Sequence, residues 1–360
     1  MALKRWALLS NALDSSSEFT PEERKAIEPF FTNLDKDVFA LTNLPEVVKG
    51  ALFSRYSRSD KSLRRVLLDE FILKPEMGFK EIVGFQVQSG TEQTVAVQKA
   101  EEFYDRVLVG YGDDSVAELG GAHLACENVS NIASKVLEEP RIGLSPLEKS
   151  TRYVWFDKKN AKGEYKYYRE PEIMASNFAD SYVETCDFLF DTYAKLVEPV
   201  KKFVVERFPQ EENVSERAYA SAVKAKACDI IRGLLPASTL TNVGIFGNGR
   251  AFEYLLLKMN ASDLQEMRLT AGEMQAELSK VIPSFVKRAD DRHGQATQQY
   301  LKETLRAVEK TSGEVLSEET EPAKEVTLVD FDENALDNVV SAILYPSSHA
   351  PLEQIKRKIA

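Results

Sequence analysis

The stretch from Asp113 to Tyr153 constrains this chain more than any other part of its sequence. An acidic turn leads into Ser115-Val-Ala-Glu118, and after Ser130 comes the apolar spacing of a short helix that Pro140 must end. The stretch closes with Glu148-Lys-Ser-Thr-Arg-Tyr153, which places a carboxylate, a hydroxyl and a guanidinium close together. Such a group can hold a phosphorylated small molecule that also forms hydrogen bonds.

Size and charge exclude several broad classes. The chain has 360 residues, enough to bury a large core, and a formal net charge of −11. Nucleic acids and anionic membranes need dense positive charge, so neither is an expected partner, and a nucleotide would be held by a few local arginines. No apolar run is long enough to cross a bilayer, and the N-terminal region lacks a secretory apolar core. We therefore expect a cytoplasmic protein.

The cysteines and histidines give no sign of a metal or disulfide site. Cys126, Cys186 and Cys228 are far apart and contain no Cys-X-X-Cys pair, which argues against disulfides and structural zinc. The three histidines are scattered along the chain. We expect no metal.

Apolar periodicity predicts a chain rich in helices. Helices are expected over residues 43–73, 131–139, 174–208 with a bend near Pro199, 215–235, and 262–287 with a kink at Pro283. A short acidic helix and an extended run are expected within residues 17–42, and strand or irregular structure over 78–97. Ser262-Asp-Leu-Gln265 predicts a capping box, and the aromatic runs at 153–156 and 165–168 predict a hairpin.

The C-terminal part resembles the N-terminal part. Residues 311–324 are rich in Glu, Ser and Thr and predict an exposed linker. After it, the apolar spacing from Leu336 to Tyr345 repeats that from Leu44 to Phe53, and serines and a basic apolar helix follow both. Any two amphipathic helices could share this spacing. We expect an N-terminal helical extension at 1–37, a main domain at 38–308, an acidic linker at 309–325 and an incomplete second copy at 326–360.

Five motifs in order resemble the flavin-dependent thymidylate synthases. One of these motifs is Glu148-Lys-Ser150-Thr-Arg152-Tyr153, which resembles the family's Ser-X-Arg-Tyr element. The others are Gly112-Asp-Asp-Ser115-Val-Ala-Glu118, Arg232-Gly-Leu-Leu-Pro236, the helix from Asn248 and Arg250 to Lys258, and Leu264-Gln-Glu-Met-Arg268. The resemblance covers about residues 38 to 285. It implies an α+β fold with a central, mainly antiparallel sheet and long helices.

The resemblance also implies an activity. In that family, dUMP is reductively methylated to dTMP, with FAD as cofactor, methylenetetrahydrofolate as carbon donor and NADPH as reductant. Four subunits pack together and share their active sites, so the resemblance implies a homo-oligomer, a dimer or a tetramer. The flavin passes on hydride, so no cysteine nucleophile is required.

Site residues carry over position by position. The resemblance assigns Glu148, Ser150 and Arg152 to catalysis and to the pyrimidine, Arg232 to the nucleotide phosphate, and Thr151 and Lys258 to the substrate. The flavin would be bound by Ser57, Ser115, Glu118, Arg141, Ile142, Asn248, Arg250 and Tyr254. Each residue also has a simpler interpretation. Asn248 could simply cap a helix, and Arg232 could simply complement a helix dipole.

The signature itself is altered. The family's Arg-His-Arg is Glu139-Pro140-Arg141 here, so a cation becomes an anion and a ring donor is lost. Eight residues rather than seven separate Arg141 from Ser150, and Val136 stands near the position of a nucleotide-binding glutamine. Two alternatives therefore stay open. The chain could be a catalytically degenerate, flavin- or nucleotide-binding half of a tandem protein, or a flavin enzyme that acts on another nucleotide.

Overall fold

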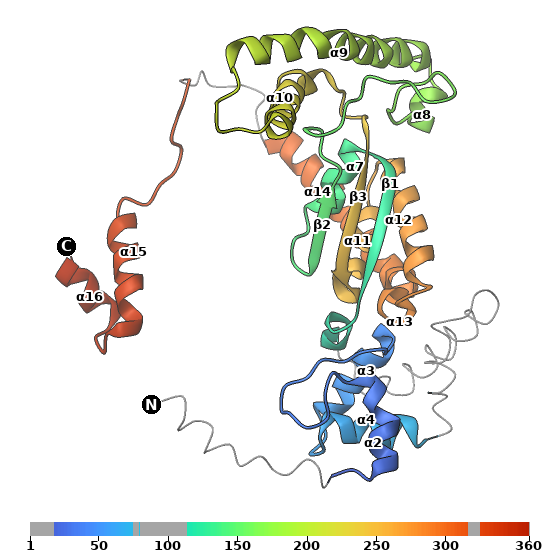
Figure 1. Ribbon diagram of the computed structural model, residues 1–360, viewed down its shortest axis with the longest axis vertical. Coiled ribbons are helices and arrows are strands. Elements are labelled where there is room, and N and C mark those ends of the chain that lie inside the picture. The colour runs from blue at the N-terminus through green and yellow to red at the C-terminus, as the bar shows by residue number, and fades with distance from the viewer. Residues whose placement is uncertain (1–17, 75–78, 80–113, 316–324, 360) are drawn as a thin grey trace. The chain divides into compact units, whose positions relative to one another are not determined.

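The computed structural model describes residues 18–74, 79, 114–315 and 325–359 (Figure 1). Contacts divide the chain into two compact units, Met1–Leu305 and Arg306–Ala360, and the boundary falls within helix α14 (Arg292–Val315). The expected strand or irregular segment at 78–97 lies outside the described residues, except for Phe79. No helix in the described part of the chain is long and apolar enough to span a membrane.

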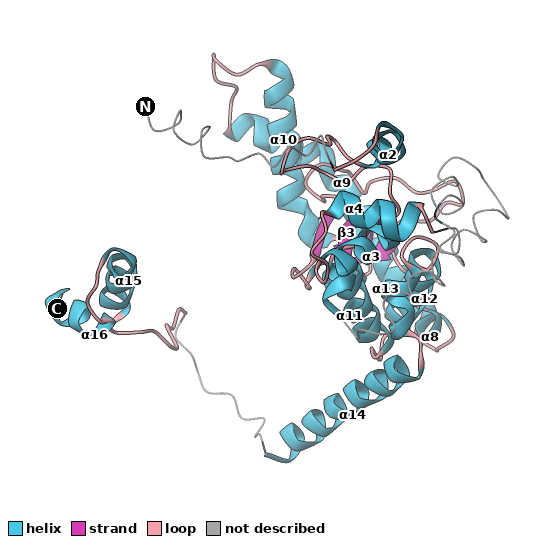
Figure 2. Ribbon diagram, turned by 90° about the horizontal axis from the view of Figure 1, so that it is seen from below, coloured by secondary structure: helices cyan, strands magenta, loops and turns pink. Residues whose placement is uncertain are grey.

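A small antiparallel sheet forms the centre of the first unit. Its strands are β1 (Gly121–Ser130), β2 (Leu144–Glu148) and β3 (Leu240–Asn248), in the order β1-β3-β2. Both neighbouring pairs are antiparallel, so β3 is the central strand. Figure 2 shows this sheet among long helices. The predicted α+β class, with a central antiparallel sheet and long helices, is confirmed.

Alternation along β3 divides the sheet into a buried face and an open face. Val243 and Ile245 are buried, and they share a core with α11 (Gly249–Asn260) and α12 (Gln265–Leu278). Phe246 on β3 and Leu147 on β2 are 49% and 80% exposed on strands that pair with each other. Since successive strand residues point to opposite faces, one side of the sheet packs on helices and the other is left open.

Helix α7 (Asn131–Glu138) follows β1 directly and has the predicted bounds. The hydroxyl of Ser130 accepts a hydrogen bond from the Ala133 amide at 3.1 Å, as expected of an N-cap. The Ser130 amide and hydroxyl donate to Glu266 at 2.7 and 2.6 Å, which ties the start of α7 to the first turn of α12. Pro140 then prevents the helix from continuing.

Two long helices pack as a pair beside the sheet. They are α9 (Ala179–Arg207), which contains Pro199, and α10 (Glu216–Ile231), which is capped by Ser215 and followed by the 3₁₀ turn η7 (Arg232–Leu234). Both helices were predicted, but the first is preceded by a separate turn of helix, α8 (Pro171–Met174). Phe190 and Tyr193 of α9 are fully buried in a shared core with Tyr165 and Tyr167.

The predicted hairpin between residues 153–156 and 165–168 is wrong. Tyr167 pairs instead with Thr239, just before β3, and the Tyr168 amide donates to the Ser238 carbonyl at 2.7 Å. Residues 151–153 form a turn. Burial against α9 and pairing with a distant segment therefore outweigh the local turn signal.

The predicted capping box at Ser262 and the long helix behind it are also wrong. Helix α12 begins at Gln265, its N-cap is Leu264, and the Ser262 hydroxyl accepts from the Leu264 amide. The helix ends at Leu278, and Pro283 starts a new short helix, α13 (Pro283–Val286), instead of kinking the old one. Proline is favoured at the first helical position, where its missing N–H costs nothing.

The N-terminal helices share one core. They are α2 (Pro21–Ile27), the 3₁₀ turn η2 (Glu28–Phe30), α3 (Glu46–Tyr56), α4 (Leu63–Leu67) and a π-helical turn η3 (Leu68–Ile72). Phe31 pairs with Leu41, so the predicted acidic helix and extended run are both present. Ile27 and Phe31 pack in the same cluster as Val48 and Leu67. Residues on both sides of position 37 thus belong to one hydrophobic core.

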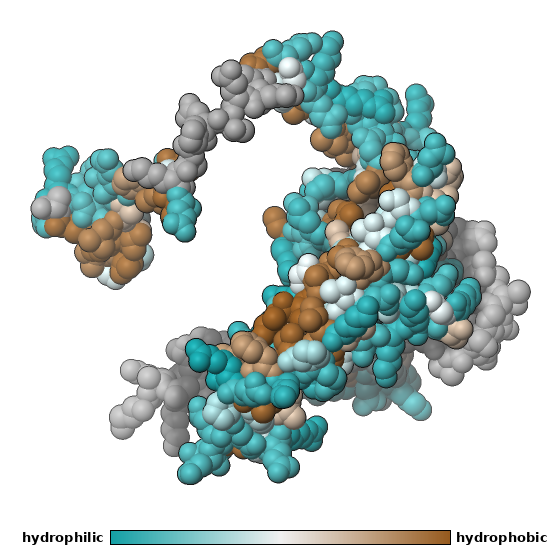
Figure 3. Space-filling view, turned by 90° about the horizontal axis from the view of Figure 1, so that it is seen from above, coloured by the Kyte–Doolittle hydropathy of each residue, from teal (hydrophilic) through white to brown (hydrophobic). Residues whose placement is uncertain are grey.

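The second unit contains a pair of helices, α15 (Ala335–Leu344) and α16 (Leu352–Ile359), joined by the 3₁₀ turn η9 (Tyr345–Ser347). The proposed repeat relates α15 to α3, but their apolar faces differ in burial. Leu336, Val339 and Ile343 are 74%, 56% and 69% exposed, whereas Leu44, Val47 and Ala51 are buried. Figure 3 shows the apolar side chains gathered on this helix pair. Helix α14 extends to Val315, into the segment expected to be a linker.

Candidate functional site

Two of the expected substrate residues meet at one carboxylate. Strand β2 ends at Glu148, and the turn after it brings Arg152 to Asp229 in the last turn of α10, with 2.9 Å between Nη2 and Oδ2. Arg232 follows α10 and lies 3.4 Å from the other oxygen of Asp229. Both arginine side chains are about half exposed, whereas that of Asp229 is 23% exposed. We call Arg152, Asp229 and Arg232 the arginine cluster.

The neighbouring polar residues lie on the same turn. The Ser150 hydroxyl accepts a hydrogen bond from the Arg152 amide at 3.2 Å, so it helps to fix the turn. Thr151 is half-buried between them. Burial raises the pKa of the Glu138 carboxyl on α7, the nearby Glu148 raises it further, and Arg141 partly lowers it. An acidic pair therefore lies beside the arginine cluster.

A cavity of about 320 Å³ lies at the other end of β2 and contains three of the expected flavin residues, Glu118, Arg141 and Asn248. Glu118 accepts from Arg250 at 2.7 Å and links η6 (Asp114–Glu118) to α11. Arg141 forms no hydrogen bond or ion pair with residues that the structure describes. We call this cavity the strand-end cavity.

Asn248 caps α11, and its position is set by Gly143. Its Oδ1 accepts from the Ala251 amide at 2.9 Å, as the simpler interpretation of this residue predicted. A Cβ atom added to Gly143 would lie only 2.8 Å from the Nδ2 atom of Asn248. Gly143 has a φ of +78°, which side chains rarely adopt. The turn into β2 therefore leaves the amide group of Asn248 directed at the glycine.

The arginine cluster and the strand-end cavity are joined by one strand pair. Leu144, which lines the cavity, pairs with Gly247, and Glu148 pairs with Val243 four residues further on. A strand rises about 3.3 Å per residue, so these two ends of β2 are separated by roughly 13 Å. The two groups of expected residues thus occupy opposite ends of one rigid element.

Other expected residues lie apart from both groups. Ile142 is 95% exposed, and Tyr254 lies on α11 with Lys258 5.7 Å from its ring centroid. Ser57 caps the end of α3 and donates to the Ser54 carbonyl. Ser115 lies in the same turn as Glu118, but its side chain is outside the described part of the structure. The side chains of Ser57, Ile142, Tyr254 and Lys258 do not line the strand-end cavity.

Asp229 is the residue that sequence reasoning missed. Its spacing to Arg232 is that of neighbours on one helix face, which is a weak and common signal. Its contact with Arg152 depends on the fold. The three cysteines are all buried, and burial together with Glu273 raises the pKa of Cys126 to about 11. Buried cysteines with raised pKa values stay protonated and unreactive at neutral pH.

A family model described as thymidylate synthase complementing protein matches residues 74–284, more than half of the chain. The chain belongs to this family. The match includes both the arginine cluster and the strand-end cavity, apart from Glu46 on the cavity wall. It confirms the resemblance that the five motifs indicated.

Longer relatives share most of this sequence. A UPF0159 protein of Chlamydia pneumoniae is 49% identical over 350 residues, which are 95% of this chain and 64% of that protein. A UPF0159 protein of Chlamydia muridarum is 47% identical over 357 residues, which are 96% of this chain and 65% of that protein. A UPF0159 protein of Thermoplasma acidophilum is 36% identical over 269 residues, which are 69% of this chain and 49% of that protein. The chain spans less than two thirds of the length of these relatives.

Two solved structures align with this chain at low sequence identity. Thymidylate synthase X of Helicobacter pylori, crystallised with FAD and dUMP, aligns with 68% of this chain and 95% of its own at 14% identity and a TM-score of 0.37. The UMP/dUMP methylase PolB of Streptomyces cacaoi, bound with 5-Br dUMP, aligns with 68% and 89% of the two chains at 14% identity and a TM-score of 0.35.

Proposed function

We propose that this chain binds dUMP and FAD, and takes part in the reductive methylation of dUMP to dTMP with methylenetetrahydrofolate and NADPH. The observation that carries the proposal is the arginine cluster, in which Arg152 and Arg232 share one carboxylate. Family membership supports the same reaction class. Ser57, Ser115, Ile142, Thr151, Tyr254 and Lys258 stay proposed contacts on the resemblance alone.

The arginine cluster suits a phosphate monoester. Two half-exposed guanidinium groups face one carboxylate, so the cluster keeps a net positive charge. A guanidinium pair can bind phosphate oxygens in a forked geometry that lysine cannot reproduce. Asp229 holds the two side chains in place before a ligand arrives, which lowers the entropy lost on binding. Glu148 and Ser150, on the adjoining turn, would then hold the pyrimidine.

The residues of the strand-end cavity fit part of a flavin. Arg141 and Asn248 offer donors to the acceptor-rich ring edge or to phosphates, and Glu118 on the cavity wall is paired with Arg250. About 320 Å³ is at the small end of ligand cavities, so it holds one portion of FAD and not the whole. When bound, a reduced flavin supplies hydride. The chain's own residues bind and orient the ligands.

A second copy of the chain would complete this site. The open face of the sheet, with Leu147 80% exposed and Phe246 49% exposed, lies between the arginine cluster and the strand-end cavity. Exposed apolar side chains on a sheet face are typical of surfaces that become buried on association. We therefore propose a homodimer or homotetramer in which this face is covered and the flavin is shared between subunits.

A catalytically degenerate protein is the second candidate, and the end of α7 favours it. Glu139 caps this helix with its amide bonded to the Lys135 carbonyl, and Pro140 follows. An anion and a proline thus occupy the two positions where the family has a cation and a ring donor. The chain would then keep its ligands while chemistry depends on the remainder of a longer protein.

Two binding measurements test the proposal. The first is to denature the purified chain, assay the supernatant for flavin, and repeat the assay after incubation with FAD. The second is titration calorimetry with dUMP. We expect bound flavin and saturable dUMP binding. A chain that binds neither ligand would overturn the proposal, whereas binding of both without dTMP formation would favour the degenerate protein.

A further inference from the structure

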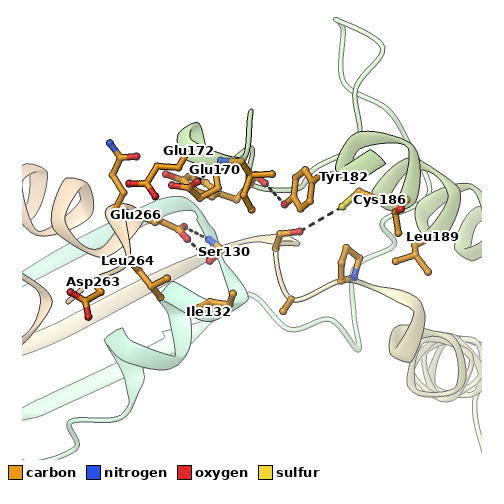
Figure 4. Close-up of a pocket in the computed structure, with 17 residues that line it drawn as sticks. Ser130, Ile132, Glu170, Glu172, Tyr182, Cys186, Leu189, Asp263, Leu264 and Glu266 are labelled. Carbon is orange, nitrogen blue, oxygen red and sulfur yellow. Dashed lines mark hydrogen bonds between the residues drawn. The ribbon is translucent and has the colours of Figure 1, made fainter. Parts of the chain in front are cut away.

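A second, larger cavity lies apart from the residues expected to bind dUMP or FAD. Its volume is about 590 Å³. It is lined by the start of α7, by α8 and the residues before it, by the first half of α9, by the segment 236–238 that leads into β3, and by the start of α12 (Figure 4). None of the residues expected to bind dUMP or FAD is among the 17 that line it. We call it the α8–α9 cavity.

The walls of the α8–α9 cavity are mostly apolar. Ile173 of α8 and Leu189 of α9 face it together with Pro236, Ile132 and Leu264. A volume of this size with apolar walls and a few polar atoms is typical of sites for small organic molecules. Figure 4 shows the acidic side chains of Glu170, Glu172 and Glu266 close together on one side.

Two acceptor atoms in this cavity lack a donor among the residues that the structure describes. They are Oε1 of Glu170 and Oε1 of Gln265, and both atoms are buried. The other oxygen of Glu170 accepts from the Ile173 amide at 2.9 Å and so caps α8. A buried acceptor without a partner is costly, so a ligand that donates hydrogen bonds would be favoured here.

Two of the hydroxyl donors around the cavity are already committed. The Ser130 hydroxyl donates to Glu266 at 2.6 Å, and the Tyr182 hydroxyl donates to the Tyr168 carbonyl at 2.6 Å. The amides at the starts of α7 and α8 are capped by Ser130 and Glu170. The groups left for a ligand therefore include the two unpaired acceptors.

The charge of the lining is negative. Glu170, Glu172, Asp263 and Glu266 are among the 17 lining residues, and none of those residues is Lys, Arg or His. The pKa of the Tyr168 phenol is raised by burial and by Glu266 and Glu170, as expected in such surroundings. Burial also raises the pKa of the Cys186 thiol, which therefore stays neutral. Nothing on this wall would attract an anion.

We propose that the α8–α9 cavity binds a small ligand with an apolar body and a protonated amine. The amine donates to Glu170 and Gln265, and the apolar body packs against Ile173, Leu189 and Pro236. This site is separate from the arginine cluster, which takes a phosphate, and the two have opposite charge. The proposal therefore stands whether or not the chain binds dUMP.

Titration calorimetry on the full chain with three probes of similar shape tests this proposal. The probes are 2-phenylethylammonium, the neutral 2-phenylethanol and the anionic 3-phenylpropionate. We expect the ammonium to bind at least about tenfold more tightly than the alcohol, about 1.4 kcal/mol, and the anion not to bind. Equal affinity for the ammonium and the alcohol, or no ammonium binding up to about 1 mM, would overturn the proposal.

Variants place the binding in the cavity. Glu170→Gln keeps an acceptor for the cap of α8 but removes the charge, and we expect it to weaken only the ammonium, by about fivefold or more. Thr185→Trp fills the cavity from an exposed position on α9 and should abolish binding of the ammonium and the alcohol. The control is Glu212→Gln, on the exposed loop after α9. Unchanged ammonium binding in Thr185→Trp would contradict the proposed site.

Discussion

Arg152 and Arg232 form ion pairs with the two oxygens of the same carboxylate, that of Asp229, at 2.9 and 3.4 Å. One arginine follows strand β2 and the other follows helix α10, so this contact joins the sheet to the long helices. An exposed ion pair contributes little to stability. Its value here is that it holds two cationic groups in one place, which a phosphate can then use.

The first prediction concerns Gly143, beside the strand-end cavity. Gly143→Ala should cost about 1–2 kcal/mol of stability, because its φ is +78°, and should also displace Asn248, because the new Cβ lies 2.8 Å from Nδ2. Flavin affinity should therefore fall. Gly163→Ala is the matched control, since Gly163 has the same φ of +78° but open space around it. If both variants bind FAD equally well, Asn248 does not hold the flavin.

The second prediction concerns Ser130, which caps α7 and donates to the buried Glu266. Ser130→Ala removes a cap worth about 1 kcal/mol and a charge-assisted hydrogen bond worth about 1–2 kcal/mol. We expect a loss of about 2–3 kcal/mol in the free energy of unfolding, measured by urea denaturation. Ser215→Ala, at the exposed cap of α10, should lose only about 1 kcal/mol. Equal losses would mean that the Glu266 contact contributes nothing.

The third prediction is a pH dependence at Glu138. Burial and the nearby Glu148 raise the pKa of Glu138 above its ordinary value of 4.5, so the folded chain binds more protons than the unfolded chain just above that pH. Its contribution to stability is therefore present below pH 4.5 and is lost as the pH rises through the raised pKa. The stability of Glu138→Gln relative to the wild type should therefore increase as the pH rises from 4.5 to about 7. Denaturation midpoints of the two proteins across this range measure the difference. A difference in stability between the two proteins that does not change with pH would contradict the raised pKa of Glu138.

The fourth prediction separates an enzyme from a degenerate protein. If Glu139 and Pro140 replace catalytic groups, as the degenerate candidate requires, the unmodified chain should form little or no dTMP even with FAD and dUMP bound. Glu139→Arg with Pro140→His should restore activity only in part, since misplacement by about 1 Å can cost about a hundredfold in rate. The control is Glu139→Gln with Pro140→Ala. Rapid dTMP synthesis by the unmodified chain would refute the degenerate-site argument.

Local signals in the sequence predicted the local structure well. Ser130 and Pro140 set the bounds of α7 because a cap and a helix-breaking ring act within one turn. The Ser262 signal failed because α12 begins only at Gln265, with Leu264 in the cap position, and the Ser262 hydroxyl accepts from the Leu264 amide instead. The hairpin failed because Tyr167 pairs with Thr239. Long-range pairing depends on burial, which local turn residues do not encode.

The candidate site also combines features that the local sequence predicted with contacts that only the fold shows. Motif spacing indicated Arg152 and Arg232, but only the fold shows that they share Asp229. Glu118, Arg141 and Asn248 come from three separate segments and line one cavity. The α8–α9 cavity had no signal in the sequence, because its lining residues are ordinary apolar and acidic side chains until five segments bring them together.

Titration calorimetry with dUMP on the wild type and on Arg232→Ala tests the central claim most directly. We predict that the variant binds dUMP more weakly by about 1.5–3 kcal/mol, the scale of a charge-assisted hydrogen bond, and that both proteins bind deoxyuridine, which lacks the phosphate, equally. Arg217→Ala, which removes an exposed arginine at the start of α10, should behave as the wild type. Unchanged dUMP affinity in Arg232→Ala, or no dUMP binding by the wild type, would contradict the account.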